Sequence, residues 1–342
     1  MKKTLAILLV LVLAIGLIGC GTDTVEDTEE DVVEESNVVE DAEESEVVED
    51  AEDATEETYK LGVILQTLAN ESQAYWQILF NELSADYGFD VTIYDGTDAT
   101  VQCDAIRDNI AQDVDAILIC VTDSSAVVPA LTEAKQAGLV IGLLNTTIDV
   151  MDGTAHDFYV GVDDVLAGEA AASAFIANFP DGANVVEIGG GIGSSPATNR
   201  HDGFTSGLEG SNINVLEYQA CESWIANQAM GIMENMIVKY GDEIEGVYVH
   251  WDNGATTVLQ ALEAAEMSDI FVVGVDGCRA GFDQVRDGTQ AVTIMQNFDK
   301  LIPEALKITK NAVTGEAFDA ENILDWEIIS IDNIDDFNYP QW

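Results

Sequence analysis

Short apolar runs with the composition of buried strands alternate with amphipathic segments over most of the chain. The run Phe271–Val275 shows this most clearly, because four of its five residues are apolar and three of those are Val. Such a run is typical of a strand that is buried on both faces of a parallel sheet. The turn signal Asp276-Gly277 follows it, and then a helical pattern at Phe282–Asp287. We therefore expect an α/β fold with parallel sheets.

The alternation falls into two series of similar length. In the first series, strands are predicted at Leu61–Gln66, Val91–Tyr94, Ala116–Val121 and Val140–Leu144, and helices at Gln73–Gly88, Val101–Asp113 and Val127–Ala137. The second series follows a loop at Thr146–Asp157, with strands at Tyr159–Val162, Val185–Ile188, Val215–Tyr218, Val247–His250 and Ile270–Val275, and helices at Leu166–Phe179, Ala197–Leu208, Ala226–Tyr240 and Thr257–Ala265. Two such series predict two Rossmann-like lobes, because the tail from Ala291 holds too few elements for a third.

The N-terminus resembles the export signal of bacterial lipoproteins. Lys2 and Lys3 precede an apolar run, Leu5–Ile15, that is too short to span a membrane comfortably. The run closes with Leu17-Ile18-Gly19-Cys20, which is similar to a lipobox. This resemblance implies a signal peptide at 1–19, a lipid on Cys20, and attachment to the extracytoplasmic face of the cell membrane. The alternative is an uncleaved anchor with an incidental Cys.

An acidic segment follows Cys20. Residues 21–58 hold 19 of the 64 acidic residues and no Lys or Arg. Apolar residues in this segment never reach the density that a core needs, so we expect 20–58 to be a disordered tether. A calcium-binding tail is the alternative, although no ligand loop is visible. The net charge of −52 makes nucleic acid a poor partner.

Six stretches carry a resemblance to a known family: KLGVILQTLAN, DAILICVTDSSAVVPAL, QAGLVIGLLN, GSSPATNRHDGF, FVVGVDG and AVTIMQ. Residues 60 to about 330 resemble the type I periplasmic binding proteins for simple sugars, and the pattern is closest to ribose-binding protein. The resemblance implies two lobes joined by a three-segment hinge, with crossovers near Val162, Gln296 and Trp326. The implied lobes are 59–162 plus 297–325, and 163–296 plus 326–342.

The resemblance implies a binding protein that performs no chemistry. It implies a monomer that captures a sugar or polyol between its lobes and delivers it to the permease of an ABC importer. Asp276 matches the strand-end Asp that receives two ligand hydroxyls, although an Asp before Gly also commonly caps a turn. Arg200 matches an Arg that donates a planar fork to sugar oxygens. Its alternative is a surface Arg paired with Asp202. Gln296 matches the hinge-side Gln of the family.

Aromatic residues of the family's cleft also have counterparts. Tyr75 and Trp76 match a pair in the first lobe, and Trp224 matches one in the second, with core packing as the alternative for each. Gln66 and Asn70, at the first strand end and in the loop after it, are weaker candidates.

Two positions depart from the family pattern. Asn145-Thr146 replaces an Asp-Arg pair, and His250-Trp251-Asp252 stands where many relatives have Asn-Asp, so that Trp251 takes the place of a polar contact. The pocket is therefore expected to be more aromatic and less charged than a ribose site. This favours a pyranose, a cyclitol or a larger sugar derivative.

Other kinds of site are not supported by the sequence. Gly191-x-Gly193 lacks the third glycine of a dinucleotide loop, and no nucleophile elbow or metalloprotease motif is present. The three His residues are scattered along the chain, so we expect no metal, no cofactor and no enzyme. A sensing subunit for a chemoreceptor or kinase, with a signalling molecule such as a furanosyl autoinducer as its ligand, stays an alternative. A surface hydrolase would need a nucleophile or a carboxylate pair, and the sequence shows neither. Four further cysteines can pair or stay free: Cys103, Cys120, Cys221 and Cys278.

Overall fold

The computed structural model describes residues 57–267 and 269–342. The predicted signal peptide, Cys20 and the predicted tether up to residue 56 lie outside the described residues. In the part that is described, no helix is both long enough and apolar enough to cross a membrane.

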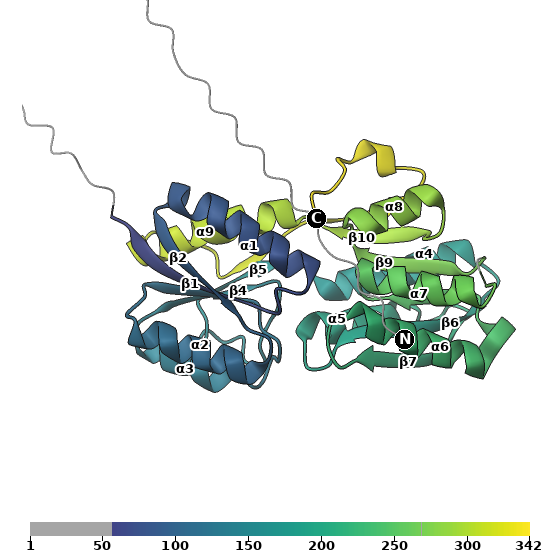
Figure 1. Cartoon of the computed structure of the whole chain (residues 1–342), viewed down its shortest axis with the longest axis horizontal. Helices are drawn as coiled ribbons and strands as arrows, with labels where there is room; N and C mark the ends of the chain where they lie inside the picture. The colour runs from purple at the N-terminus through teal and green to yellow at the C-terminus, as the bar shows by residue number, and fades with distance from the viewer. Residues whose placement is uncertain (1–56, 268) are drawn as a thin grey trace, which may run out of the picture. The chain divides into compact units, whose positions relative to one another are not determined.

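The first lobe is built on a six-stranded sheet in which all neighbouring strands run parallel, in the order β11-β5-β4-β3-β1-β2. Helices α1 and α9 cover one face of this sheet, and α2 and α3 cover the other (Figure 1). Its strands are β1 (Tyr59–Leu65), β2 (Phe89–Asp95), β3 (Ala116–Ile119), β4 (Val140–Leu144), β5 (Phe158–Gly161) and β11 (Glu321–Ile323). Its helices are α1 (Glu71–Leu83), the 3₁₀ turn η1 (Ser84–Tyr87), α2 (Ala99–Ala111), α3 (Val128–Gln136) and α9 (Phe298–Thr314).

The second lobe has a six-stranded sheet in the order β12-β10-β9-β8-β6-β7, in which only β12 is antiparallel to its neighbour. Helices α4 and α5 pack on one face, and α6 and α7 on the other. Its strands are β6 (Ala183–Gly191), β7 (Ile213–Cys221), β8 (Gly246–Val249), β9 (Phe271–Asp276), β10 (Val292–Gln296) and β12 (Trp326–Ser330). Its helices are α4 (Asp164–Asn178), α5 (Ser195–Gly207), α6 (Ala226–Tyr240), η2 (Gly241–Glu243), α7 (Asp252–Ala264), α8 (Arg279–Asp287) and η3 (Ile334–Asp336).

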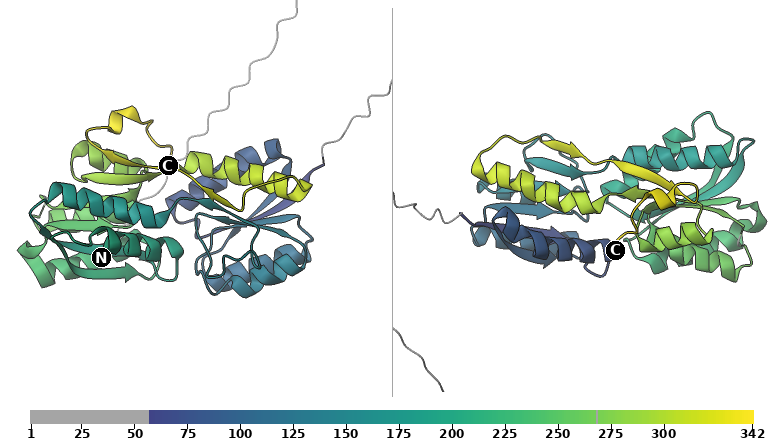
Figure 2. Two further views of the ribbon diagram at one scale, coloured as in Figure 1. Left: turned by 180° about the vertical axis from the view of Figure 1, so that it is seen from behind. Right: turned by 90° about the horizontal axis from the view of Figure 1, so that it is seen from above.

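The chain passes between the two sheets three times: after β5, after β10, and between β11 and β12. Helix α9 therefore lies against the first lobe although it follows the second lobe in the chain (Figure 2). The predicted fold class, two Rossmann-like lobes with a three-segment hinge, is confirmed. Strand β5, expected to open the second series, instead belongs to the first sheet. The exact lobe boundaries stay a prediction.

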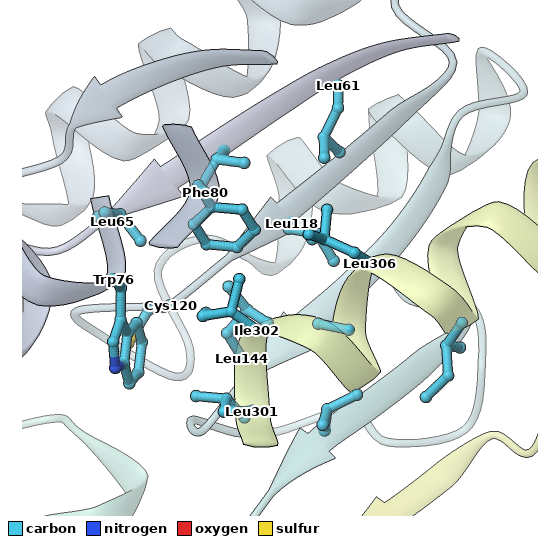
Figure 3. Packing of buried hydrophobic residues seen from close by; sticks show 14 of the residues in the cluster. Leu61, Leu65, Trp76, Phe80, Leu118, Cys120, Leu144, Leu301, Ile302 and Leu306 are labelled. Carbon is cyan, nitrogen blue, oxygen red and sulfur yellow. The ribbon is translucent and has the colours of Figure 1, made fainter. Parts of the chain in front are cut away.

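Alternating side chains of each strand fill separate cores on the two faces of a sheet, as the two-residue period of a strand requires. In β1, Leu61 and Leu65 pack with Phe80 of α1 and with α9, whereas Ile64 faces the core under α2 and α3. Trp76 and Cys120 lie at one end of the first of these cores (Figure 3). That end is also where the strands stop, and in parallel α/β sheets ligands bind beyond the carboxyl ends of the strands.

We expect Phe80→Ala to lower the free energy of unfolding by about 3–5 kcal/mol, because it removes a ring from a fully packed core. Phe80 is 0% exposed. Urea unfolding followed by circular dichroism measures the loss. Ile78→Ala in the same helix is the control, since Ile78 is 52% exposed and should lose under about 0.5 kcal/mol. Equal losses in the two variants would contradict this description of the core.

Candidate functional site

The structure brings nine of the ten predicted ligand-binding residues to the lining of one cavity between the lobes. The cavity, called the inner cavity below, has a volume of about 50 Å³. The nine are Gln66, Asn70, Trp76, Asn145, Arg200, Trp224, Trp251, Asp276 and Gln296. They come from strand ends, loops and the helices α1 and α5, far apart in the sequence, and they meet because both sheets end at this cleft.

Asp276 is the last residue of β9, and its backbone is strained. Its φ of 123° lies in a region that residues other than glycine rarely adopt. The adjoining backbone is held in place, because the Asp252 carboxylate accepts hydrogen bonds from the N–H groups of Gly277 (2.9 Å) and Cys278 (3.3 Å). A strained residue persists only where its surroundings over-determine it, and such residues cluster at functional sites.

Asp252 itself is fully buried at the start of α7. Besides the two backbone donors, it accepts hydrogen bonds from Thr293 Oγ1 (2.8 Å) and Gln290 Nε2 (2.8 Å). Burial raises the pKa of Asp252, and these four donors oppose that rise. Four donors on one buried carboxylate make it a structural clamp for the corner that presents Asp276.

A chain of hydrogen bonds runs from the first lobe through the hinge to Asp276. Asn145 Nδ2 donates to Gln296 Oε1 (3.1 Å), and Gln296 Nε2 donates to Asp276 Oδ1 (2.8 Å). Burial raises the pKa of the Asp276 carboxyl, and the positive charge of Arg200 offsets this only in part. Asp276 Oδ2 makes no hydrogen bond to any described residue, so it can accept one from a ligand.

Arg200 reaches the inner cavity from α5 and is 2% exposed. Its Nε donates to Asp164 Oδ1 (2.8 Å), and its Nη1 donates to the backbone oxygen of His250 (2.5 Å). The surface pairing with Asp202 is therefore wrong, since the partner is the buried Asp164. A guanidinium has five N–H donors, so three are left for a ligand.

Three tryptophans form the apolar part of the lining. Trp76 meets the ring of Phe298 edge to face, with centroids 4.9 Å apart. Trp224 and Trp251 also meet edge to face, at 5.5 Å, and the Arg200 guanidinium lies 5.6 Å from the Trp224 ring centroid. Packing fixes these rings, so they offer a ligand rigid flat surfaces at little entropic cost.

Tyr75 is the predicted residue that does not line the inner cavity. Its hydroxyl donates to Asp299, and its ring stacks on Trp342 at a centroid distance of 6.3 Å. Tyr75 and Trp76 are neighbours on a helix and so point about 100° apart, which leaves only one of them facing the cavity. Tyr75 therefore secures the C-terminal residues against α1 instead.

The two weaker candidates have mainly structural hydrogen bonds. Gln66 Nε2 donates to the backbone oxygen of Val121 (2.7 Å), which links two strand ends. Asn70 Oδ1 caps α1 by accepting from the N–H of Ser72 (3.0 Å). The Gln66 carbonyl and the Asn70 amino group have no hydrogen bond to the residues that the structure describes, so both can still face a ligand.

Four buried polar atoms of residues that line the inner cavity have no hydrogen-bond partner among the described residues. They are Trp76 Nε1, Trp251 Nε1, Asn145 Oδ1 and Ser194 Oγ. Buried polar groups are almost always paired, and an unpaired one costs roughly 1–3 kcal/mol. These atoms are two indole donors, one amide acceptor and one hydroxyl group. Together they are complementary to a ligand with several oxygen atoms.

Direct hydrogen bonds between the lobes close the cleft. Ser124 N donates to Gly193 O (3.0 Å), and Thr147 N donates to Ser195 Oγ (2.8 Å). Asn253 Nδ2 donates to Glu71 Oε2 (2.8 Å). The inner cavity is far smaller than the roughly 300–1,000 Å³ of most ligand pockets. The lobes must therefore part, or side chains must move, before a sugar can enter.

Several lining residues were missed by the sequence reasoning. They are Ser72, Gln73, Cys120, Ser194, Pro196 and Phe298, together with Thr146, which was noted only as a departure. Gln73 could have been found, since it lies three residues before Trp76 on the same helical face. Ser194 and Pro196 lie inside the motif that contains Arg200. Cys120 and Phe298 carry no sequence signal, because each also belongs to the hydrophobic core.

The histidines are less scattered in space than in sequence. The buried Glu187 carboxylate bonds His201 Nδ1 (2.9 Å) and His250 Nε2 (2.9 Å), and these hydrogen bonds lower the pKa of Glu187 against the effect of burial. Even so, the described residues hold no group of three side chains arranged to bind a metal ion. Cys103, Cys120, Cys221 and Cys278 are all free thiols.

Comparison with known proteins gives consistent matches. A family model described as periplasmic binding protein domain matches residues 61–317. The ribose import binding protein RbsB of Salmonella typhimurium is 29% identical over 224 residues, which cover 66% of this chain and 74% of RbsB. A xylitol-binding protein of Mycolicibacterium smegmatis is 27% identical over 239 residues, which cover 70% of this chain and 67% of that protein.

Solved structures share the fold. The crystal structure of a galactofuranose binding protein superposes with a TM-score of 0.77 at 24% identity, covering 81% of this chain and 96% of that one. A solute binding protein of an ABC transporter from Bacillus halodurans, with bound myo-inositol, gives 0.77 at 24% identity, with 82% and 97% covered.

We expect Asp252→Ala to destabilise the protein by about 3–5 kcal/mol, because it leaves four donors without their buried acceptor. Thermal unfolding measured by calorimetry detects the loss. The matched control is Asp242→Ala, since Asp242 is exposed at the end of α6. A stability of Asp252→Ala within about 1 kcal/mol of the unmodified chain would show that the clamp is not needed.

Proposed function

The chain belongs to the periplasmic binding protein family, and from this premise we propose that it captures a neutral sugar or polyol in the inner cavity and delivers it to an ABC importer. The family consists of binding proteins, so the chain is not an enzyme. Its mechanism is capture of the ligand followed by closure of the two lobes.

The observation that carries this proposal is the convergence of unpaired polar atoms on one cavity. The indole N–H groups of Trp76 and Trp251 need acceptors, whereas Asn145 Oδ1 needs a donor. A hydroxyl group is both donor and acceptor, so a polyol can satisfy all of these atoms at once. The tryptophan rings supply the flat apolar surface that the C–H faces of a sugar ring need.

The charges near the cavity favour a neutral ligand. Among the described residues that line the cavity, Arg200 is the one cation, and it is already paired with Asp164. Burial raises the pKa of the carboxyl groups of Asp276 and Asp252, so a further negative charge placed beside them would be unfavourable. A carboxylate or phosphate on the ligand would therefore be repelled, whereas hydroxyl groups can donate to Asp276 and accept from Arg200.

The relatives support this class of ligand, since their names refer to ribose, xylitol and galactofuranose. Asn145 and Trp251, which by the sequence resemblance stand where the family has charged or polar groups, both line the inner cavity. We therefore propose a pyranose, a cyclitol or a larger sugar derivative rather than ribose.

The N-terminal sequence signals support a location at a membrane. We propose that residues 1–19 are removed, that Cys20 carries a lipid, and that 20–58 tether a monomeric binding unit to the extracytoplasmic face of the cell membrane. The tether would let the lobes reach the permease while the protein stays anchored.

A thermal-shift panel of pentoses, hexoses and cyclitols on the full-length chain tests the proposal. A ligand at 100 times its Kd should stabilise the protein by about 2.7 kcal/mol. We expect Asp276→Ala to abolish that shift, because it removes the carboxyl group that accepts a hydrogen bond from a ligand hydroxyl. The control is Asp287→Ala, an exposed acid on the neighbouring helix α8 that should keep the full shift. An unchanged affinity in Asp276→Ala would refute the assigned site, and the absence of any stabilising sugar or polyol would refute the function.

Membrane attachment has its own test. We expect Cys20→Ser to move the protein from the membrane fraction to the soluble fraction of the cell, because serine offers no thiol for the lipid. Fractionation after a salt wash, followed by immunoblotting, measures the distribution. Cys103→Ser is the control, since Cys103 lies in α2 and should leave attachment unchanged. Continued membrane association of Cys20→Ser would rule out the lipid anchor.

A further inference from the structure

We propose that the cleft binds a ligand longer than a monosaccharide, namely a disaccharide or another neutral glycoside whose second unit fills a cavity beside the inner one. This inference rests on the proposed function and deepens it by naming the size and charge of the ligand. The second cavity, called the outer cavity below, has a volume of about 250 Å³.

The outer cavity adjoins the inner one, because the two share part of their lining. Gln66, Asn70 and Trp224 line both cavities. Both lobes contribute to its walls: Thr97 and Thr122 come from the first lobe, and residues 191–192 and 222–224 from the second. A group bound there would therefore be enclosed by the same closure that encloses a sugar in the inner cavity.

The order of the strands shows the direction in which the cleft extends. The inner cavity lies at the ends of β3, β4, β9 and β10, near the strands where the chain crosses between lobes. Part of the lining of the outer cavity comes from the residues directly after β2 and β7 in the chain. These two are the edge strands farthest from the crossovers. A ligand that occupies both cavities thus runs from the hinge side of the cleft toward its open side.

Trp224 stands between the two cavities and cannot easily move. Its ring lies so close to the backbone that a Cβ atom on Gly190 would be 2.1 Å from it. Its edge-to-face contact with Trp251 holds it from the other side. A fixed aromatic surface shared by two adjoining cavities suits a ligand with two linked rings.

Three of the polar groups of the outer cavity are carboxylates, which act as acceptors, and the others include hydroxyl and amide groups. Asp98 Oδ1 caps the start of α2, and Asp123 Oδ1 accepts hydrogen bonds from the N–H groups of Ser125 and Ala126 in the turn before α3. Oδ2 of each Asp has no partner among the described residues. Hydrogen bonds from the backbone N–H of Ala126 and from Ser125 lower the pKa of Asp123, which keeps it ionised at neutral pH. Glu222 adds a third carboxylate.

No Lys or Arg is found among the described residues that line the outer cavity. Three carboxylates without a cation would repel a uronate or a phosphate on the second unit of the ligand. They would accept hydrogen bonds from its hydroxyl groups. The second unit is therefore expected to be uncharged and hydroxylated.

Calorimetric titration of the full-length chain tests the inference. The probes are glucose, galactose and myo-inositol, the disaccharides maltose, cellobiose, lactose and melibiose, and the acidic analogue lactobionate. We expect at least one disaccharide to bind roughly tenfold or more tightly than its component monosaccharides, and lactobionate to bind more weakly than lactose.

A blocking variant locates the second unit. Thr97→Phe fills the outer cavity from an exposed position and should weaken disaccharide binding by roughly tenfold or more. It should change monosaccharide affinity by less than about twofold, because Thr97 does not line the inner cavity. The matched control is Thr100→Phe, since Thr100 is exposed on α2 and lines neither cavity.

Three outcomes would overturn the inference. Monosaccharides that bind as tightly as every disaccharide would leave the proposed function intact and remove only the longer ligand. A Thr97→Phe variant that weakens both classes equally, or neither, would show that the outer cavity holds no part of the ligand. If no sugar or cyclitol of either size binds, the proposed function fails first and this inference fails with it.

Discussion

The cleft depends on one buried carboxylate that never faces it. Asp252 accepts four hydrogen bonds and fixes the corner between β9 and α8. Asp276 is thereby held at a positive φ, which a residue other than glycine rarely adopts. The glycines around Asp252 show how tightly this corner is built, since a Cβ on Gly281 would lie 2.1 Å from the carboxylate. Asp252, which does not line the inner cavity, thus fixes the position of Asp276, which does.

The same arrangement couples the acceptor to the motion of the lobes. Asp276 is bonded to Gln296 at the hinge, and Gln296 is bonded to Asn145 in the first lobe. A ligand hydroxyl that donates to Asp276 therefore acts on a chain of hydrogen bonds that spans the hinge. Arg200 is fixed in a comparable way between Asp164 and the backbone of His250, so both charged groups of the cleft are oriented before a ligand arrives.

Much of this could be predicted from the sequence, because strand ends and short motifs are local signals. The run ending at Asp276 predicts both a buried parallel strand and a polar group at its carboxyl end. The features that were missed depend on contacts between distant segments. Tyr75 is turned from the cavity by Asp299 and Trp342, and Arg200 finds its partner 36 residues away in Asp164. Likewise, Glu187 brings His201 and His250 together, and no spacing in the sequence reveals that contact.

The tryptophans in the lining affect how the cleft can discriminate between ligands. A charged pair attracts any ligand with suitable hydroxyl groups. An indole N–H group, in contrast, donates one hydrogen bond in one fixed direction, and it becomes an unpaired buried donor when no acceptor lies there. Trp76 and Trp251 each carry such a donor in the lining. A ligand that lacks an oxygen at either place would leave that donor buried and unsatisfied, at a cost of roughly 1–3 kcal/mol. Selectivity in this cleft therefore follows from the penalty for a missing oxygen more than from the strength of any single attraction.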